Sequence, residues 1–240
     1  EISCSLVGSE MCIRDRAEYN DPRLSRAFIT KQGTSGKEQA PGTADNAVYA
    51  PNGTPEQGTS KYGTSLFMYS ISAPTLLLSY HELKFLEAEA LCRLERDAKS
   101  ALKDAVVAGL LNAENSFTIS RKELGKTLIN AASSITEAEA ESYFDNTIEA
   151  KYTAEPLKTT MTQKYFALWG ASGEATESYN DVRRMKGLGE NFIELKNPNS
   201  FPLRCPYGNS DTTTNAEVKA AYGNGQYVYS ENVWWAGGSR

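Results

Sequence analysis

The chain has 240 residues, a formal net charge of −5 at pH 7 and an isoelectric point near 5.2. This length can bury a hydrophobic core. The acidic balance and the scattered Lys and Arg residues argue against a nucleic-acid partner, which needs clustered basic side chains. No run of about 18 apolar residues occurs, so the sequence predicts no segment that spans a bilayer. The 13 Tyr and 3 Trp residues suit either an anchored core or a surface on which sugar rings stack.

Residues 1–16 (EISCSLVGSEMCIRDR) fit no pattern in the rest of the chain. They resemble a translated sequencing-adapter read-through, and we expect them to be an artefact that makes few core contacts. Cys4 is not preceded by the basic and apolar regions of a signal peptide, so no lipid anchor is predicted there. The folded sequence is expected to begin near Ala17. Cys92 and Cys205 are far apart in the sequence, and we expect neither a metal site nor a cofactor.

Residues 31–65 are expected to form a long loop. They are rich in Gly, Thr, Ser, Pro and Asn and show no helical or strand period. A loop of this length inside a compact domain is usually either functional or disordered. Its aromatic residues Tyr49 and Tyr62 are therefore candidate ligand-binding residues, although a plain solvated loop is the simpler interpretation.

Residues 76–111 are expected to form two packed helices joined by a tight corner. In the capping box Ser79-Tyr80-His81-Glu82, the Ser79 hydroxyl accepts the amide of Glu82, and Glu82 reaches back to the Ser79 amide. Leu78 and Leu83 are placed to form a hydrophobic staple. Apolar residues three and four apart predict the buried face of the first helix, namely Tyr80, Leu83, Leu86, Ala90, Leu91 and Leu94.

The second helix of the pair is expected to follow an N-cap at Asp97. Its inner stripe consists of small residues and one leucine, namely Ala98, Ala101, Leu102, Ala105 and Gly109. Small side chains let two helix axes approach closely, so the pair is typical of an αα-hairpin of the tetratricopeptide kind.

The chain is expected to stay helical over residues 79–185. Capping boxes at Ser120 and Thr136 predict two further helix starts, and Pro156 suits the first turn of another helix. Residues 187–240 are rich in Asn, Gly, Tyr and Trp and are expected to be irregular, with Trp234 and Trp235 as candidate stacking residues. The predicted class is all-α, with tetratricopeptide-like helical hairpins, long irregular loops and a coil-rich C-terminal tail.

No catalytic motif stands out in the sequence, and the chain is not expected to be an enzyme. Glu82, Glu87 and Glu89 resemble paired carboxylates for acid–base chemistry, but the cap and an exposed spacing account for them. His81 is the single histidine, and no serine or cysteine lies in the sequence context of a nucleophile elbow, so a Ser-His-Asp catalytic site is not expected. Asp181 with Arg183 and Arg184 suits either an anion grip or, more simply, ion pairs that hold a neighbouring loop.

Four stretches together resemble the SusD/RagB family of nutrient-binding outer-membrane lipoproteins. They are YHELKFLEAEA (80–90), TQKYFAL (162–168), SYNDVRR (178–184) and FPLRCPY (201–207). The resemblance covers about residues 17–240 and only the C-terminal portion of such proteins, which are roughly twice as long. It implies a tetratricopeptide-like scaffold whose loops form a ligand surface.

The family resemblance also implies a function. Such proteins are lipid-anchored at the cell surface, cover SusC-like TonB-dependent barrel transporters, and capture oligosaccharides or, in some branches, peptides. This chain lacks the anchor cysteine, so anchoring is expected only of a full-length parent. The alternative is a helical-repeat module that binds peptides or proteins.

A family member cut near its middle should also leave an apolar patch uncovered. Leu110, Leu111 and the outer side of the helix at 157–169 are the candidates for that patch.

Overall fold

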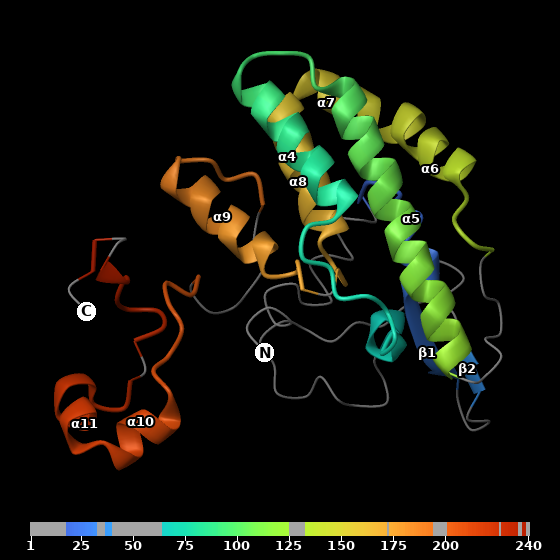
Figure 1. The fold of residues 1–240 in the computed structure, drawn as a ribbon. Coiled ribbons are helices and arrows are strands. Elements are labelled where there is room, and N and C mark those ends of the chain that lie inside the picture. The colour runs from blue at the N-terminus through green and yellow to red at the C-terminus, as the bar shows by residue number, and fades with distance from the viewer. Residues whose placement is uncertain are drawn as a thin grey trace. The chain divides into compact units, whose positions relative to one another are not determined.

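The computed structural model describes residues 18–32, 37–39, 64–124, 133–171, 173–193, 201–225, 227–234 and 237–238. The chain divides into two compact units, Glu1–Lys196 and Asn197–Arg240, each described here by itself. Helices dominate the described parts of the chain (Figure 1), which confirms the predicted helical class. None of the described helices combines the length and the hydropathy that a membrane crossing requires.

The first unit is built on a pair of long helices joined by a short corner. α4 (Tyr80–Arg93) and α5 (Lys99–Leu124) lie side by side, and α8 (Pro156–Ala167) packs against both (Figure 1). The other helical elements in the described part of this unit are α3 (Leu24–Ala27), η3 (Leu66–Tyr69), α6 (Glu137–Tyr143), the π-helical η4 (Phe144–Ile148), α7 (Glu149–Ala154) and α9 (Glu177–Gly187). The predicted αα-hairpin is therefore confirmed.

A small antiparallel sheet occupies the start of the first unit, in the strand order β2-β1-β3. β1 (Phe28–Gln32) pairs with β2 (Lys37–Gln39), placing Thr30 opposite Gln39. It pairs on its other edge with β3 (Thr64–Ser65). The ends of the segment 31–65 are thus strands where a loop was expected. Strands of two to five residues are too short to show an alternating pattern of apolar and polar side chains in the sequence. Their formation depends on pairing with other segments of the chain, which the sequence does not display.

The core of the first unit consists of two clusters that share α5. One joins α4, α5 and the α6–α8 region, with Phe85, Leu102, Leu110, Phe144 and Ile148 almost fully buried. The other joins the N-terminal segment to α5 and α8 through Leu24, Leu66, Phe117 and Phe166. The predicted stripe of small residues on α5 is buried. A Cβ added at Gly109 would lie 3.1 Å from that of Ala167 on α8, so glycine permits this close approach.

The prediction of which face of α4 is buried was wrong. The buried residues are His81, Glu82, Phe85, Ala88 and Glu89, whereas Tyr80, Leu83, Leu86, Ala90 and Leu94 are exposed. The staple is also absent, because Leu78 and Leu83 are both largely exposed. The helical spacing correctly placed these apolar residues on one face of α4. The spacing alone does not determine whether that face is turned toward the core or toward solvent. The apolar patch expected at Leu110 and on α8 is also wrong, because Leu110 and most of α8 are buried.

The predicted helix ends are confirmed in part. The Thr136 hydroxyl accepts the Glu139 amide at 3.2 Å, and Pro156 opens α8. The helix start predicted at Ser120 is wrong, because α5 continues to Leu124 and the Ser120 hydroxyl donates back to the Ser116 carbonyl at 2.8 Å. A serine inside a helix satisfies itself in this way without ending the helix.

The second unit contains two short helices within the region expected to be irregular. They are α10 (Asn209–Thr214) and α11 (Ala216–Tyr222). The Asn215 side chain caps α11 by accepting the amides of residues 217 and 218. The rings of Tyr207 and Tyr222 stack with their centroids 4.4 Å apart, so aromatic contacts anchor this unit internally.

Candidate functional site

The structure describes only one of the four predicted stacking residues. Trp234 lies in the second unit and is 75% exposed. Tyr49, Tyr62 and Trp235 lie outside the described residues. A platform formed by these four aromatic residues therefore stays a prediction.

An open cleft of about 550 Å³ lies between α4, α8 and α9 in the first unit. Its lining is mostly charged or polar, and Leu86 and Ala90 are its apolar members. The lining residues are Glu82, Leu86, Glu89, Ala90 and Arg93 from α4, Lys164 from α8, and Glu177, Asn180, Asp181 and Arg184 from α9. The sequence analysis singled out most of these acids and Arg184, but it missed Lys164.

At one end of the cleft, Glu82 forms a buried carboxyl pair with Glu174. The Ser79 hydroxyl accepts the Glu82 amide at 3.1 Å, as the capping box predicted. The second half of the box was wrong, because the Ser79 amide donates to Glu174, which precedes α9, and not to Glu82. Burial, followed by the hydrogen bond to Glu174, raises the pKa of Glu82 to about 7. Glu82 therefore holds a proton at mildly acidic pH.

His81 lies directly behind this carboxyl pair and is almost fully buried. Its Nε2 atom is 3.2 Å from the Ser79 hydroxyl and 3.8 Å from Glu174 Oε2. Burial lowers the pKa of His81, and the negative charge of Glu174 offsets this only in part. A hydrolytic triad needs the serine and the acid on opposite ring nitrogens. Here both approach Nε2, and the serine is the cap of α4, so the arrangement is not that of a triad.

The other end of the cleft is a chain of ion pairs that joins α9 to α4. Glu89, only 5% exposed, accepts two hydrogen bonds from Arg184 and one from Arg93 at 2.7 Å. Burial alone would raise the pKa of Glu89, but the two guanidinium groups outweigh it and hold that pKa below its ordinary value. The exposed position predicted for Glu89 was wrong. The predicted ion pairing of Arg184 is confirmed, but its partners lie on the helices α4 and α9 and not on a loop.

The floor of the cleft is a lysine held by an aspartate. Lys164 is 2% exposed, and its ammonium lies 2.8 Å from Asp181. Asp181 also accepts a hydrogen bond from Arg184 at 2.8 Å. The three basic side chains that line the cleft, Arg93, Lys164 and Arg184, each form an ion pair with an acidic side chain. The cleft therefore leaves none of these three side chains without an acidic partner for binding an anion. No group of three or more His, Cys, Asp or Glu residues in the described ranges could hold a metal ion.

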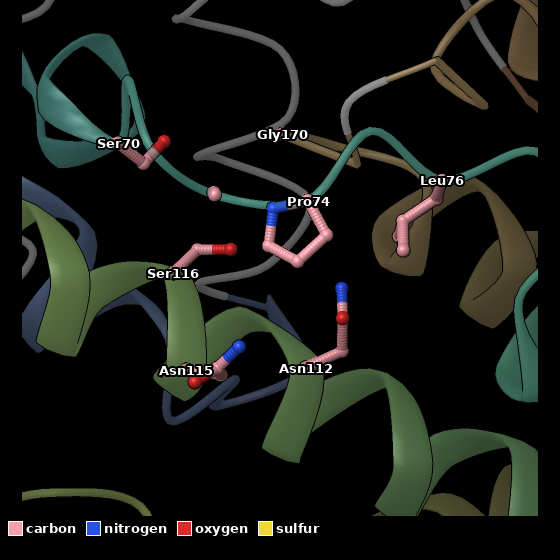
Figure 2. A pocket seen from close by; sticks show the side chains of 8 residues that line it. Ser70, Pro74, Leu76, Asn112, Asn115, Ser116 and Gly170 are labelled. Atoms are coloured by element: carbon pink, nitrogen blue, oxygen red, sulfur yellow. The ribbon is translucent and has the colours of Figure 1, made fainter.

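A second, much smaller cavity lies between α5 and the segment that follows η3. It measures about 30 Å³, enough for one or two waters. Figure 2 shows Asn112 and Ser116 projecting from α5 toward the segment that carries Pro74. The size and polar lining of this cavity suit a hydration site between two packed segments. The cavity is too small to hold a nutrient molecule.

The fold and the cleft together define a tetratricopeptide-like helical scaffold with a polar, ion-paired recess. The model of the SusD-like family, described as starch-binding and associating with the outer membrane, matches residues 6–207. The chain belongs to this family, which confirms the resemblance drawn from the four stretches. The match begins inside the segment 1–16, and the adapter origin of that segment stays a prediction.

The solved structures agree with this assignment. A SusD/RagB family protein from Bacteroides thetaiotaomicron VPI-5482 is 62% identical with a TM-score of 0.85, over 97% of this chain and 50% of its own. A SusD homolog from Bacteroides fragilis NCTC 9343 (19% identity, TM-score 0.59) is matched over 93% of this chain and 51% of its own.

An outer membrane protein from Bacteroides vulgatus ATCC 8482 (21% identity, TM-score 0.58) is matched over 93% of this chain and 50% of its own. At these identities, the last two share the fold alone. The chain spans about half the length of these relatives. No curated protein sequence matches it significantly.

Proposed function

We propose that this chain belongs to the substrate-binding component of an outer-membrane nutrient uptake system, with an oligosaccharide as its ligand. The observation that carries the proposal is membership of a family described as starch-binding and outer-membrane-associated. The 62% identity to a SusD/RagB protein supports it. The full-length protein would be lipid-anchored at the cell surface and would work with a SusC-like TonB-dependent transporter.

The geometry supports binding in preference to catalysis. His81 is buried against the Ser79 cap and Glu174, out of reach of a substrate. Glu89, a carboxylate considered for acid–base chemistry, is neutralised by Arg93 and Arg184. Among the described acids of the cleft, Glu89 and Asp181 meet basic side chains and Glu82 meets another carboxyl group. Glu177 accepts hydrogen bonds from Asn180, and none of these acids is placed beside an activated nucleophile.

The stacking platform remains our proposal for the ligand surface, with Tyr49, Tyr62, Trp234 and Trp235 as its members. The exposure of Trp234 supports its part in this surface, because a solvent-facing indole of this size is available to a sugar ring. Each stacking contact is worth about 1 kcal/mol, which corresponds to roughly fivefold in affinity.

The test is calorimetric titration of starch-derived and other oligosaccharides into this chain and into the full-length Bacteroides thetaiotaomicron relative. Trp234→Ala should weaken binding by this chain about fivefold. Tyr229→Ala, a half-exposed aromatic of the same unit, is the matched control and should not. Binding that survives alanine at all four aromatic positions would exclude the platform. Peptide binding without glycan binding by both proteins would favour the helical-repeat module instead.

A further inference from the structure

Glu174 ties the connection between α8 and α9 to the N-terminus of α4. Its side chain is buried, and its Oε1 atom accepts the Ser79 amide. Its Oε2 atom is also buried and has no hydrogen-bond donor among the described residues. The nearby His81 Nε2 atom, 3.8 Å away, is beyond hydrogen-bond distance. Because a buried acceptor without a donor is costly, this side of Glu174 needs a donor that an ionised neighbour does not supply.

Glu82 is placed to supply that donor when it carries a proton. It too is almost fully buried, and its side chain hydrogen-bonds to Glu174. Two carboxylates in one buried site cannot both ionise cheaply, so the pair retains one proton. The protonated Glu82 then donates to Glu174, while the other oxygen of Glu174 accepts the Ser79 amide. The proton is therefore part of the contact between α4 and the connection.

The charged groups around Glu82 do not replace this proton. Lys164 on α8 favours the ionised form of Glu82, whereas burial, Glu174 and the charge of Glu177 on α9 favour the protonated form. Lys164 is also committed elsewhere, since its ammonium lies 2.8 Å from Asp181. The opposing charge of Lys164 is thus outweighed, and the pair holds its proton.

His81, the remaining titratable group beside the pair, acts with the opposite sign. Burial lowers its pKa, the charge of Glu174 raises it in part, and Arg23 from the N-terminal segment lowers it further. His81 is therefore neutral when the carboxyl pair is protonated, and it gains charge only as the pH falls. Its effect on the contact can be told from that of Glu82 by the direction of the pH change.

The two ends of α9 are attached in different ways. Toward its C-terminus, Arg184 donates to Glu89 on α4 at 2.8 Å, and Val182 and Met185 are buried. These contacts do not depend on a proton near neutral pH. The start of α9 depends on the connection that carries Glu174. Loss of the proton would therefore free this end while the other end of α9 stays attached.

We propose that the Glu82–Glu174 carboxyl pair is a proton-operated latch, whose opening at higher pH frees the connection between α8 and α9 and widens the open cleft at its Glu82 end. With the latch open, Glu82 has an ordinary pKa of 4.5, and the closed latch raises that pKa to about 7. The open form therefore gains on the closed form as the pH rises from 4.5 to 7 and gains no more above it. The proposal does not depend on the identity of the ligand.

The experiment is amide hydrogen exchange of this chain by NMR at pH 5 and pH 8, with each rate divided by the intrinsic rate at that pH. The Ser79 amide, which Glu174 binds, is the reporter. Its protection should fall about tenfold between the two pH values. At pH 8 its exchange should not respond to low concentrations of urea, which marks a local opening. The Leu110 amide, in the buried middle of α5, should show the urea dependence of global unfolding.

Three variants locate the proton. Glu82→Gln removes the titrating carboxyl and should abolish the tenfold change. Glu174→Gln keeps an oxygen for the Ser79 amide and should abolish it as well, so the test does not rest on one variant. Glu87→Gln is the matched control, since Glu87 is half exposed on the same helix, and it should keep the change.

Three outcomes would overturn the latch. The first is a tenfold change that survives Glu82→Gln. The second is protection of the Ser79 amide that falls as the pH is lowered below 6.5, because His81 would then be the titrating group. The third is a Ser79 amide that exchanges only in step with the Leu110 amide in urea, because the carboxyl pair would then be a fixed part of the fold that opens only when the chain unfolds.

Discussion

Glu82→Gln should stabilise the chain at pH 8 and have almost no effect near pH 4. The pKa of Glu82 is raised from an ordinary value of 4.5 to about 7, so the folded state prefers the protonated carboxyl. The stability that Glu82 contributes is fully present below pH 4.5 and is lost as the pH rises through 7. Glutamine keeps the shape and a hydrogen-bond donor toward Glu174 but never ionises. The variant therefore escapes this loss.

The magnitude follows from the size of the pKa shift. A shift of about 2.5 units corresponds to roughly 3 kcal/mol. Because Glu82 also lines an open cleft, solvent screens part of its charge, and we expect about 1–2 kcal/mol at pH 8. His81 acts in the opposite direction, since its pKa is lowered and its contribution is lost as the pH falls below 6.5. His81 is present in both proteins, so the difference between them isolates Glu82.

The assay is urea unfolding of both proteins at several pH values between 4 and 8. The difference in free energy of unfolding should grow from about zero to 1–2 kcal/mol, which is a rise in melting temperature of about 3–6 °C for a chain of this size. Glu87→Gln is the control, because Glu87 is half exposed on the same helix and pairs with Lys84, and this variant should not be more stable than the parent chain at pH 8. A variant less stable than the parent chain at pH 8 would refute the reasoning.

Three further predictions concern stability. Glu89→Gln should lower the free energy of unfolding by about 2–3 kcal/mol, measured by urea unfolding, because Arg93 and Arg184 lose their shared carboxylate; a loss below 0.5 kcal/mol would contradict the buried ion pair. Gly170→Ala should cost more than about 2 kcal/mol, because its Cβ would lie 2.5 Å from the Phe67 ring at a φ of +76°. Gly189→Ala, at a φ of +75° with open space around it, should cost only about 1 kcal/mol, and equal melting temperatures for the two variants would contradict this account.

The hairpin could be predicted because its signals are local. Ser79 and Thr136 cap the helices that follow them, as their positions relative to Glu82 and Glu139 indicated. The small residues of α5 indicated a close helix contact, and Gly109 provides one. Each of these signals depends on residues within one or two turns of the chain, which a sequence displays directly.

What could not be predicted depends on partners that are distant in sequence. Glu174 reaches the Ser79 amide across 95 positions, and Arg184 reaches Glu89 across the same span. Without those partners, Glu82 and Glu89 have the spacing of an exposed acidic face. Lys164 has no neighbour in sequence that marks it as a cleft residue. Its position in the cleft depends on the ion pair with Asp181, which is distant in sequence.

The capping of α4 by Glu174 bears on the order in which the chain becomes structured during synthesis. Ribosomes add about 5–20 residues per second, so Glu174 emerges roughly 5–20 s after the Ser79 amide that it will bind across 95 positions. Throughout that interval the first turn of α4 has the Ser79 hydroxyl as its side-chain cap, without the second cap from Glu174. The leucines of its outer face are meanwhile accessible to chaperones or to a neighbouring nascent chain. Glu174 thus acts late, and its loss should accelerate unfolding more than it slows folding.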